Sequence, residues 1–527
     1  MSDVIVVGAG LAGLVAAHEL TSRGRSVTLV DQENAHNLGG QAFWSFGGLF
    51  LVDSPEQRRL RVRDSFELAW NDWLGSAGFD RLDDEDRWAH RWARAYVEFA
   101  AGEKRSWIAE QGIELTPIVG WAERGDLTAG GHGNSVPRFH VAWGTGTGVV
   151  APFVASAQRA GDQGLLTFCH RHRVDELIVD QGAVTGVRGR ILAPDDAPRG
   201  APSTRDEIGD FELHAQAVIV TTGGIGANHD LVRRFWPERM GTAPRHMISG
   251  VPAYVDGRGL EIAARGGARL VNRDRMWHYT EGLHNWNPIW PAHGIRILPG
   301  PSSLWLDALG RRLPAPCFPG YDTVGTLQYL RTADGLAEHD HSWFVLTRRI
   351  LEKEFALSGS EQNPDITGGS KREVMRSRLA RGIPGPVKDF QEQGADFVTA
   401  GTIEELVAGM NALTEQPLLD AVTVREQIEQ RDLQVANPFA RDAQIQGIHN
   451  SRRYLGDRLS RTTAPHRLLD PDNGPLIGVK LHTLTRKTLG GIQTDLDSRA
   501  LGADGEPVDG LYAAGEVAGF GGGGVHG

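Results

Sequence analysis

The chain begins with a regular exchange of apolar and polar stretches. Residues 4–7 read Val-Ile-Val-Val, an apolar run typical of a strand buried on both faces of a parallel sheet. Residues 14–20 have helical periodicity, and residues 27–30, Val-Thr-Leu-Val, indicate a second buried strand. This order predicts a β-α-β unit over residues 3–31, in which a helix covers two parallel strands.

The pattern changes twice further along the chain. Strand patterns recur up to about residue 275, the patterning of a dinucleotide domain is missing between about 276 and 487, and strand patterns return after residue 487. We therefore predict an α/β fold in which a Rossmann-like domain is interrupted by an inserted α+β domain. The expected strands lie at 165–169, 174–180, 183–191, 211–221, 491–495 and 510–514, the expected helices at 56–111, 257–266, 334–358, 371–381, 402–413 and 418–431, and an irregular stretch at 118–148.

Three glycines stand directly after the first strand. Gly8, Gly10 and Gly13 have G-x-G-x-x-G spacing. The first glycine allows a sharp turn, the second lets backbone N–H groups approach a pyrophosphate, and the third lets the helix pack on the strand. Asp31 ends the second strand, where a carboxylate accepts hydrogen bonds from a ribose. We therefore predict a dinucleotide site at the N-terminus of the first helix, where unpaired N–H groups favour negative charge.

Other glycine-rich segments follow along the chain. Residues 39–48 read Gly-Gly-Gln-Ala-Phe-Trp-Ser-Phe-Gly-Gly, and paired glycines let a backbone pass close to a flat ring. Residues 217–224 and 510–519 are each a strand that runs into a glycine turn, and residues 256–259 read Asp-Gly-Arg-Gly. Together with the first motif, these segments indicate a flavin dinucleotide.

In this order the segments resemble the fumarate reductase and succinate dehydrogenase flavoprotein superfamily, and most closely its 3-ketosteroid Δ1-dehydrogenase-like branch. The resemblance implies an FAD-binding domain over 1–275 and 488–527, and a capping domain over 276–487 that closes over the isoalloxazine. Members of the superfamily continue beyond the glycines at 521–524, into a helix that points at the flavin pyrimidine. We therefore expect the second part of the FAD domain to be truncated here.

The resemblance also implies which positions contact FAD. Val174 would meet the adenine through its backbone, and Glu516 would meet the ribityl chain. Succinate dehydrogenases carry a histidine covalently bonded to the flavin where this chain has Gln41, so we expect FAD to be bound non-covalently. The expected contact positions are Gly8, Gly10, Ala12, Gly13, Asp31, Gln32, Gly39, Gly40, Gln41, Ser45, Gly47, Gly48, Val174, Thr222, Gly223, Asp256 and Glu516.

The substrate residues of fumarate reductases are not matched. Those enzymes bind a dicarboxylate with a Thr-Glu pair, two histidines and two arginines, which supply fixed donors for two carboxylates. At the position expected for the Thr-Glu pair this chain has Ile295-Arg296, and Arg486 and Lys487 replace the histidines. Residues 304–313 align with an apolar strand of the family, and the arginine expected after this segment is replaced by residues 319–322. Dicarboxylate reduction is therefore disfavoured.

Residues 319–322, Pro-Gly-Tyr-Asp, resemble instead the Pro-Tyr-x-Asp of the ketosteroid dehydrogenases, with one residue inserted. There a tyrosine abstracts a proton next to a carbonyl while hydride leaves for flavin N5. A phenol titrates near 10, so its anion needs a nearby cation. We expect Tyr321 to be catalytic, with Arg486 or Lys487 stabilising the phenolate. Alternatively, Tyr321 is a packing residue of the cap.

The aromatic stretch at 276–305 would either stack a flat apolar ligand or belong to the core. The tyrosine that steroid enzymes carry near 475–478 is missing, which weakens a steroid assignment.

The charge, the cysteine count and the length of the apolar runs argue against several other classes of protein. The net charge of −11 argues against a nucleic-acid partner, and Cys169 and Cys317 are too few for a disulfide framework. The histidines show no metal-ligand spacing, so we predict no metal. No apolar run is long enough to span a membrane, and the first strand begins at once, so we expect a cytoplasmic protein without a signal peptide.

The favoured hypothesis is an FAD-dependent oxidoreductase that dehydrogenates a bulky, apolar ketone at its α,β bond and passes electrons to an unidentified acceptor. One alternative is an enoate reductase of the fumarate or urocanate type, with Arg486 or Lys487 as proton donor. Another is an FAD-binding protein without turnover, in which the missing C-terminal helix abolishes catalysis.

Overall fold

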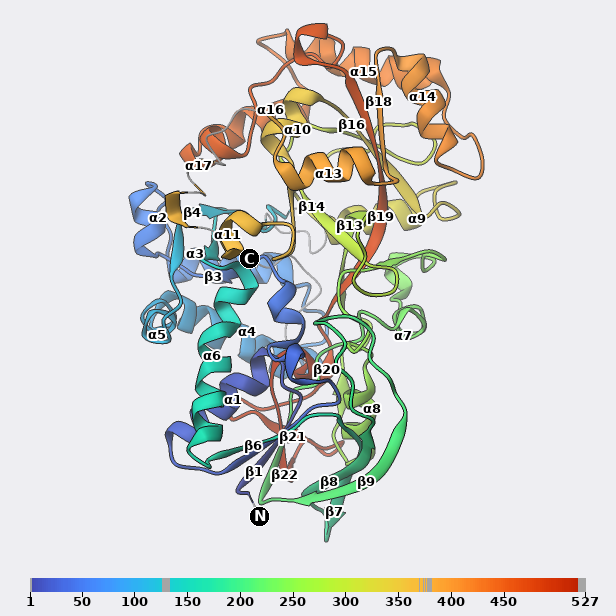
Figure 1. The fold of residues 1–527 in the computed structure, drawn as a ribbon. Helices are drawn as coiled ribbons and strands as arrows, with labels where there is room; N and C mark the ends of the chain where they lie inside the picture. The colour runs from blue at the N-terminus through green and yellow to red at the C-terminus, as the bar shows by residue number, and fades with distance from the viewer. Residues whose placement is uncertain are drawn as a thin grey trace.

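The computed structural model describes residues 2–125, 133–368, 370–372, 374, 376 and 382–519. A six-stranded sheet forms the lower part of the molecule in Figure 1, with strand order β21-β22-β10-β1-β2-β6. All neighbouring strands are parallel except the β21–β22 pair at the edge. The strands are β1 (Val4–Val7), β2 (Val27–Val30), β6 (Leu166–Cys169), β10 (Ala217–Val220), β21 (Arg499–Leu501) and β22 (Pro507–Ala513).

The predicted β-α-β unit is confirmed. The central strand β1 pairs with β2 along one edge and with β10 along the other, and most of its apolar run is buried. On one face, α1 (Leu11–Ser22) packs beside α6 (Thr145–Asp162). On the other lie α8 (Arg258–Arg265) and the antiparallel meander of β7 (His172–Asp180), β8 (Ala183–Leu192) and β9 (Glu207–His214).

Short helices and a small sheet flank this domain. Trp73 belongs to the local core and Trp70 packs against it, and the rings of Trp73 and Phe50 lie 5.6 Å apart. The prediction of an irregular stretch at 118–148 was wrong in part, because β4 and β5 pair there and α6 begins; its residues 126–132 lie outside the described residues. The elements are α2 (Pro55–Arg59), α3 (Phe66–Ala77), α4 (Asp86–Ala101), α5 (Lys104–Glu110), β3 (Gly48–Phe50), β4 (Leu115–Gly120) and β5 (Phe139–Ala142).

An eight-stranded sheet forms the upper part of the molecule (Figure 1). Its large core is built by strands and helices that come mostly from 276–488. The strands are β11 (Ile248–Ser249), β13 (Met276–His284), β14 (Gly294–Leu298), β15 (Leu304–Leu306), β16 (His341–Thr347), β17 (Ala356–Leu357), β18 (Phe397–Ala400) and β19 (Leu476–Thr488). The helices are α9 (Thr323–Thr332), α10 (Arg348–Glu354), α11 (Pro364–Gly368), α13 (Gly385–Gln393), α14 (Ile403–Ala412), α15 (Ala421–Val435), α16 (Ala443–Ser451) and α17 (Leu455–Ser460).

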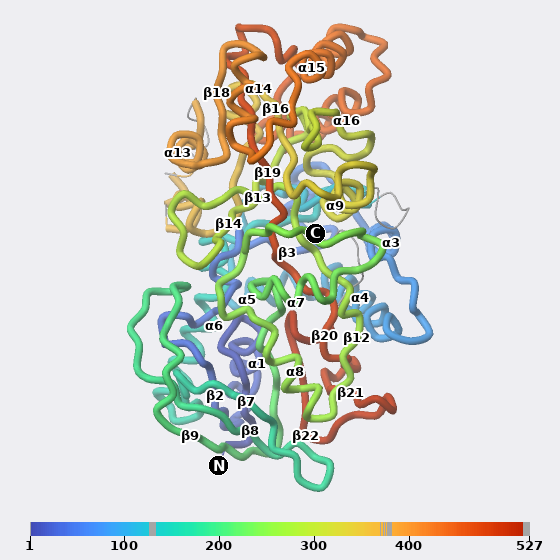
Figure 2. The backbone as a smooth tube through the Cα atoms, turned by 90° about the vertical axis from the view of Figure 1, so that its right-hand side faces the viewer, coloured from blue at the N-terminus to red at the C-terminus, as the bar shows by residue number. Residues whose placement is uncertain are grey.

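The long strand β19 connects the two parts. It pairs with β16 in the upper core and with β13 lower down, and in Figures 1 and 2 it descends from the upper sheet toward the lower domain. The short strand β11, which precedes residue 276, also pairs with β19, and the domain boundaries predicted from the sequence stay a prediction. The remaining elements are α7 (His229–Arg234), β12 (Leu270–Val271), β20 (Gly491–Ile492) and the 3-10 turns η1 (Ala35–Asn37), η2 (Gly40–Trp44), η3 (Glu238–Met240), η4 (Pro471–Asn473) and η5 (Gly515–Ala518).

Not all predicted helices of this region form. The helix predicted over 334–358 was wrong in part, because its centre is the buried strand β16, which pairs with β15 and β19, and within this range the helix α10 forms only over Arg348–Glu354. The helices predicted over 402–413 and 418–431 are confirmed as α14 and α15, which are capped by Thr402 and Asp420. The helix predicted over 371–381 lies mostly outside the described residues. Within the described residues, no helix has the length and apolarity needed to cross a bilayer.

Candidate active site

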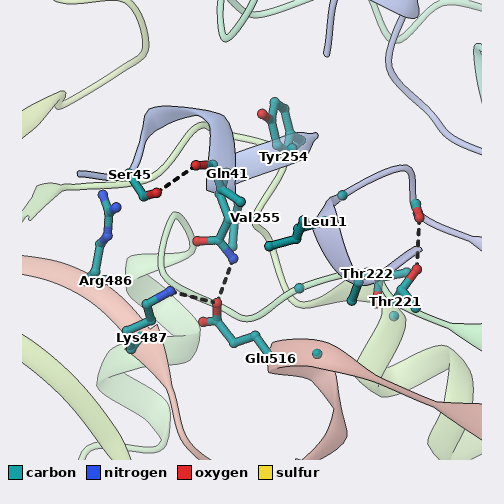
Figure 3. A pocket seen from close by; sticks show the side chains of 18 of the residues that line it. Leu11, Gln41, Ser45, Thr221, Thr222, Tyr254, Val255, Arg486, Lys487 and Glu516 are labelled. Atoms are coloured by element: carbon teal, nitrogen blue, oxygen red, sulfur yellow. Dashed lines mark hydrogen bonds and ion pairs between the residues drawn. The ribbon is translucent and has the colours of Figure 1, made fainter. Parts of the chain in front are cut away.

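A cavity of about 640 Å³ joins the two parts of the molecule. It runs from the carboxyl ends of β1, β2 and β10, along η2 and residues 45–48, to the facing strands β13, β14 and β19. Figure 3 shows side chains from these separate segments pointing into one space. Parallel sheets bind ligands at the carboxyl ends of their strands, so this position is the one expected for a dinucleotide.

The turn between β1 and α1 forms an open anion cradle. Gly8 has φ +105°, and a Cβ there would lie 2.7 Å from the Thr221 carbonyl oxygen. Gly10 is the N-cap of α1 and has no side chain to cap the helix, while a Cβ added to it would meet no atom within 4 Å. The N–H groups of the first helical turn are therefore left for a ligand, as a pyrophosphate requires.

Two of the predicted contact glycines shape the cradle without lining the cavity. A Cβ on Gly13 would lie 2.0 Å from the Gly8 carbonyl oxygen, so this glycine allows the helix to pack on the turn, as predicted. Gly39 has φ +96°, and a Cβ there would lie 3.0 Å from the Val150 side chain. The other predicted FAD positions all line the cavity.

Asp31 lies at the end of β2, as predicted, and lines the cavity. Its carboxylate accepts hydrogen bonds from the backbone N–H groups of Ala9 at 2.6 Å and Glu33 at 2.8 Å. Burial raises its pKa to about 6. Each oxygen retains a lone pair for a ribose hydroxyl. Val174 and Asp256 line the same end, and burial also raises the pKa of the Asp256 carboxyl.

At the other end of the cavity, Glu516 connects three segments of the chain. Its carboxylate accepts a hydrogen bond from Gln41 Nε2 at 2.6 Å (Figure 3). It accepts another from the backbone N–H of Thr488 at 2.8 Å. Among the described residues, Gln41 Oε1 and Thr222 Oγ1 are buried without a hydrogen-bond partner. Unpaired buried polar atoms are rare in folded proteins. Because both residues line the cavity, these atoms fit a ligand with polar edges, such as FAD.

Beyond Glu516, the cavity wall combines aromatic rings and cations. Trp277 and Tyr279 project from β13 with their rings 5.7 Å apart, and the Arg296 guanidinium from β14 lies 3.8 Å from the Tyr279 ring. The predicted pair Arg486 and Lys487, near the end of β19, lines the same space. Arg486 donates a hydrogen bond to the Gly250 carbonyl, and Lys487 Nζ lies 3.9 Å from a Glu516 oxygen.

Burial shifts two titratable groups of this end in opposite directions. It raises the pKa of the Tyr279 phenol, although Arg296 and Arg486 counteract it. It lowers the pKa of the Lys487 ammonium, which Glu516 counteracts and Arg486 assists. The Lys487 side chain is still 41% exposed, and it lines the cavity. A bound ligand would remove water from the cavity and strengthen this shift.

The structure does not bring Tyr321 together with Arg486 or Lys487. Tyr321 lines a separate cavity of about 200 Å³, beside Arg124, whose guanidinium lies 5.7 Å from its ring. Trp121 lines both cavities and stands between them as a shared wall. The tyrosine that lines the large cavity with the cations is Tyr279.

A buried cluster behind Arg296 was missed by the sequence analysis. Arg296 Nη2 pairs with Glu123 Oε1 at 2.8 Å, and Arg296 Nε lies 3.7 Å from Glu281 Oε2. Burial, together with Glu281 and Asp322, raises the pKa of Glu123 to about 8 despite the guanidinium. The Thr-Glu pair that the sequence analysis sought at 295–296 is present in β13, as Thr280-Glu281. It was overlooked because it lies one strand earlier in the β13–β14 hairpin.

Comparisons with known proteins agree with this site. Residues 3–527 match the family described as FAD binding domain. The chain belongs to this FAD-binding family. It is 62% identical, over its full length and 91% of the relative, to a KsdD-like steroid dehydrogenase of Mycobacterium tuberculosis. It is 61% identical, over its full length and 94% of the relative, to another of Mycolicibacterium smegmatis. The predicted cofactor and the predicted class, an FAD-dependent oxidoreductase, are thereby confirmed.

Two solved structures share the fold of this flavoprotein. The 3-ketosteroid Δ1-dehydrogenase of Sterolibacterium denitrificans aligns with a TM-score of 0.65 and 16% identity, over 98% of this chain and 94% of that one. The 3-ketosteroid-Δ4-(5α)-dehydrogenase of Rhodococcus jostii RHA1 aligns with a TM-score of 0.61 and 18% identity, over 99% and 92%. At this identity the likeness concerns the fold.

The two helix glycines provide a matched test of the cradle. We expect Gly10→Ala to weaken FAD binding strongly while leaving the stability of the apoprotein near that of wild type, because the new methyl group enters the cavity and meets no protein atom. We expect Gly13→Ala to destabilise the apoprotein by about 1–3 kcal/mol, because its methyl group overlaps the Gly8 carbonyl. Thermal denaturation of the apoproteins and FAD titration measure the two effects.

A Gly10→Ala variant that binds FAD like wild type would show that the pyrophosphate does not sit against this turn. Equal loss of apoprotein stability in both variants would contradict the division of roles between the two glycines.

Proposed function

We propose that this flavoprotein dehydrogenates a steroid ketone at the bond adjacent to its carbonyl group. The observation that carries the proposal is the continuity of the larger cavity. It extends from the phosphate cradle at Gly10 to an aromatic and cationic end at Tyr279 and Arg296. A cofactor and a second, largely apolar molecule can therefore share one enclosed space. The names of the relatives that are 61–62% identical over the whole chain support a steroid as that molecule.

The far end of the cavity suits a flat molecule with one polar edge. Trp277, Leu298 and Leu484 supply apolar surface, and the polar groups converge at Tyr279 and Arg296. Pockets for small molecules generally combine apolar walls with a few polar groups that fix orientation. A ketone oxygen needs only hydrogen-bond donors, and it brings no charge to be compensated.

The proposed roles follow from the opposite pKa shifts. Pairs of titratable groups whose environments separate their pKa values are candidates for acid and base. The raised pKa keeps the Tyr279 phenol protonated, so that it donates to the ketone oxygen and stabilises the developing enolate. The lowered pKa favours a neutral Lys487 amine that accepts the proton from the α-carbon. FAD, when bound, supplies the acceptor for the hydride from the β-carbon.

Arg486 and Arg296 complete this arrangement as fixed positive charges. The Arg486 side chain is held by its hydrogen bond to the Gly250 carbonyl. Because Arg486 adjoins Lys487 in the sequence, its charge disfavours a second positive charge on the Lys487 amine. Arg296 is held between Glu123 and Glu281, so its charge is largely compensated by protein carboxylates. This compensation favours a neutral ketone over a dicarboxylate as the ligand of this end.

We also propose that FAD is held without a covalent bond. Gln41 stands where succinate dehydrogenases carry the flavin-linked histidine, and its amide is engaged with Glu516. We expect acid or heat denaturation of the holoenzyme to release all flavin into the supernatant, measured by absorbance after filtration. Yellow, fluorescent protein on a denaturing gel would contradict this.

Anaerobic reduction of the bound flavin tests the proposed reaction. We expect a 3-ketosteroid with a saturated bond beside its carbonyl to bleach the oxidised flavin band of the holoenzyme stoichiometrically, with the unsaturated ketone as product. A matched steroid alcohol without the carbonyl is the control and should leave the spectrum unchanged. If dithionite-reduced enzyme is instead reoxidised by fumarate or urocanate, and no ketosteroid bleaches it, the enoate-reductase alternative is correct. Bound flavin that responds to neither would indicate a protein without turnover.

A pair of tyrosine variants tests which phenol acts. We expect Tyr279→Phe to slow single-turnover flavin reduction by about 10²–10³-fold, the usual cost of removing one donor to a developing oxyanion. We expect Tyr321→Phe to reduce flavin at nearly the wild-type rate, because this residue lines the other cavity. Both variants keep their rings, so FAD content and substrate binding should stay close to wild type.

The reverse result, with Tyr321→Phe slow and Tyr279→Phe fast, would restore the assignment predicted from the sequence. It would also require that Tyr321 reaches the large cavity past Trp121 when substrate binds.

A further inference from the structure

Two histidines and an aspartate meet on the upper sheet, outside the large cavity. His284 ends β13, His482 lies in β19, and Asp396 directly precedes β18. The three strands lie close together in Figure 1, with β18 and β13 each paired to β19. None of these residues lines the cavity of the active site, and no step of the proposed reaction uses them.

Their side-chain atoms are spaced like the ligands of a metal ion. His482 Nε2 lies 2.9 Å and His284 Nδ1 lies 3.3 Å from an oxygen of the Asp396 carboxylate. One ligand atom from each residue can be chosen so that all lie within 4.8 Å of one another. A tetrahedral ion with bonds of about 2.0–2.1 Å places its ligands about 3.3–3.4 Å apart. Side-chain rotations alone can therefore bring the three atoms onto one ion.

The charge of the Asp396 carboxylate also points to a cation. Asp396 is only 4% exposed, and within the described residues its ion pairs are with these two imidazoles alone. The carboxylate also accepts a hydrogen bond from the His284 backbone N–H at 2.8 Å, and a cation between the two imidazoles would add compensation of its charge in the protein interior. Neutral imidazole and ionised carboxylate are the protonation states that metals bind.

A third imidazole adjoins the cluster. His341 lies directly opposite His482 in the β16–β19 ladder, so both side chains project from the same face of the sheet. Its Nε2 atom is buried and, among the described residues, has no hydrogen-bond partner. A buried nitrogen without a partner calls for an explanation, and an ion or its bound water at this face would supply one.

We propose that His284, Asp396 and His482 bind one divalent transition-metal ion, for which Zn²⁺ is the fitting species. Imidazole nitrogen and carboxylate oxygen form a ligand set that suits Zn²⁺. This set disfavours Mg²⁺, which prefers oxygen ligands alone. The His284 side chain is 49% exposed, so the site has an entry path and an open side for a fourth ligand, either water or His341. The ion would link β13 and β18 to β19, the central strand with which both of them pair.

Sequence spacing could not have indicated this site. His284 and Asp396 are 112 residues apart, and Asp396 and His482 are 86 residues apart, so no short motif contains them. The sequence analysis predicted no metal for this reason.

Cobalt is the direct probe, because Co²⁺ substitutes for Zn²⁺ and reports its coordination by visible absorption. We expect chelator-treated, full-length holoenzyme to bind one Co²⁺ per chain with the intense bands of a low-coordinate site, which Zn²⁺ abolishes and Mg²⁺ does not. His482→Ala and His284→Ala should each weaken Co²⁺ binding at least tenfold, because each removes a ligand. The matched control is His214→Ala, which removes an exposed histidine whose ion pair, among the described residues, is with Glu212.

The wild-type protein decides the proposal by itself. The absence of saturable, one-to-one Co²⁺ binding would overturn it, and the three side chains would then form only a hydrogen-bonded link between strands. Binding that survives in both alanine variants would equally overturn it, because the ion would lie elsewhere. The His284 side chain is half exposed, so His284→Ala should keep wild-type FAD content and thermal stability without added metal, and a loss of Co²⁺ binding in it is then specific.

Discussion

The hydrogen bond from the Thr488 backbone to the Glu516 carboxylate connects the two halves of the active site. Thr488 ends β19, the strand that runs down from the upper sheet, and Glu516 lies in the glycine-rich turn after β22. Because this bond fixes the end of β19 against the dinucleotide domain, Arg486 and Lys487 are held at the cavity wall. The same carboxylate orients Gln41, so one partly buried acid sets the positions of groups from three distant segments.

Burial then shifts the pKa values of the groups at this end of the cavity. In an enclosed cavity the neutral forms of phenol and amine are both favoured, which pushes the pKa of Tyr279 up and that of Lys487 down. The guanidinium of Arg296 stays charged because Glu123 and Glu281 surround it. The result is a phenol donor, a lysine whose pKa is lowered, and compensated cations at the end of a cofactor cavity. Such a set suits the removal of a proton beside a neutral carbonyl better than the binding of two carboxylates.

The parts that the sequence could predict are those with local causes. The β-α-β unit and its glycines follow from apolar runs and turns within thirty residues, and the structure confirms them. β16 was mistaken for helix because its apolar run is buried on both faces in the upper core, so it lacks the alternation of a half-buried strand, and its pairing partners lie far away in the sequence. Tyr279 was considered only as one aromatic residue of the stretch at 276–305. The Thr280-Glu281 pair and the His284 cluster were missed, because their partners lie tens to hundreds of residues away along the chain. The spacing of glycines along the chain is enough to predict a cofactor site. The substrate end of the cavity is built from residues on several strands, so it can be identified only once the fold is known.

The central claim is that one cavity holds the flavin at Glu516 and the ketone at Tyr279. A crystal structure of the holoenzyme with a bound ketosteroid measures this directly. The account predicts the isoalloxazine beside Gln41 and Glu516, and the steroid carbonyl oxygen within hydrogen-bond distance of the Tyr279 hydroxyl or the Arg296 guanidinium. A steroid bound in the smaller cavity, with its carbonyl at Tyr321, would contradict it.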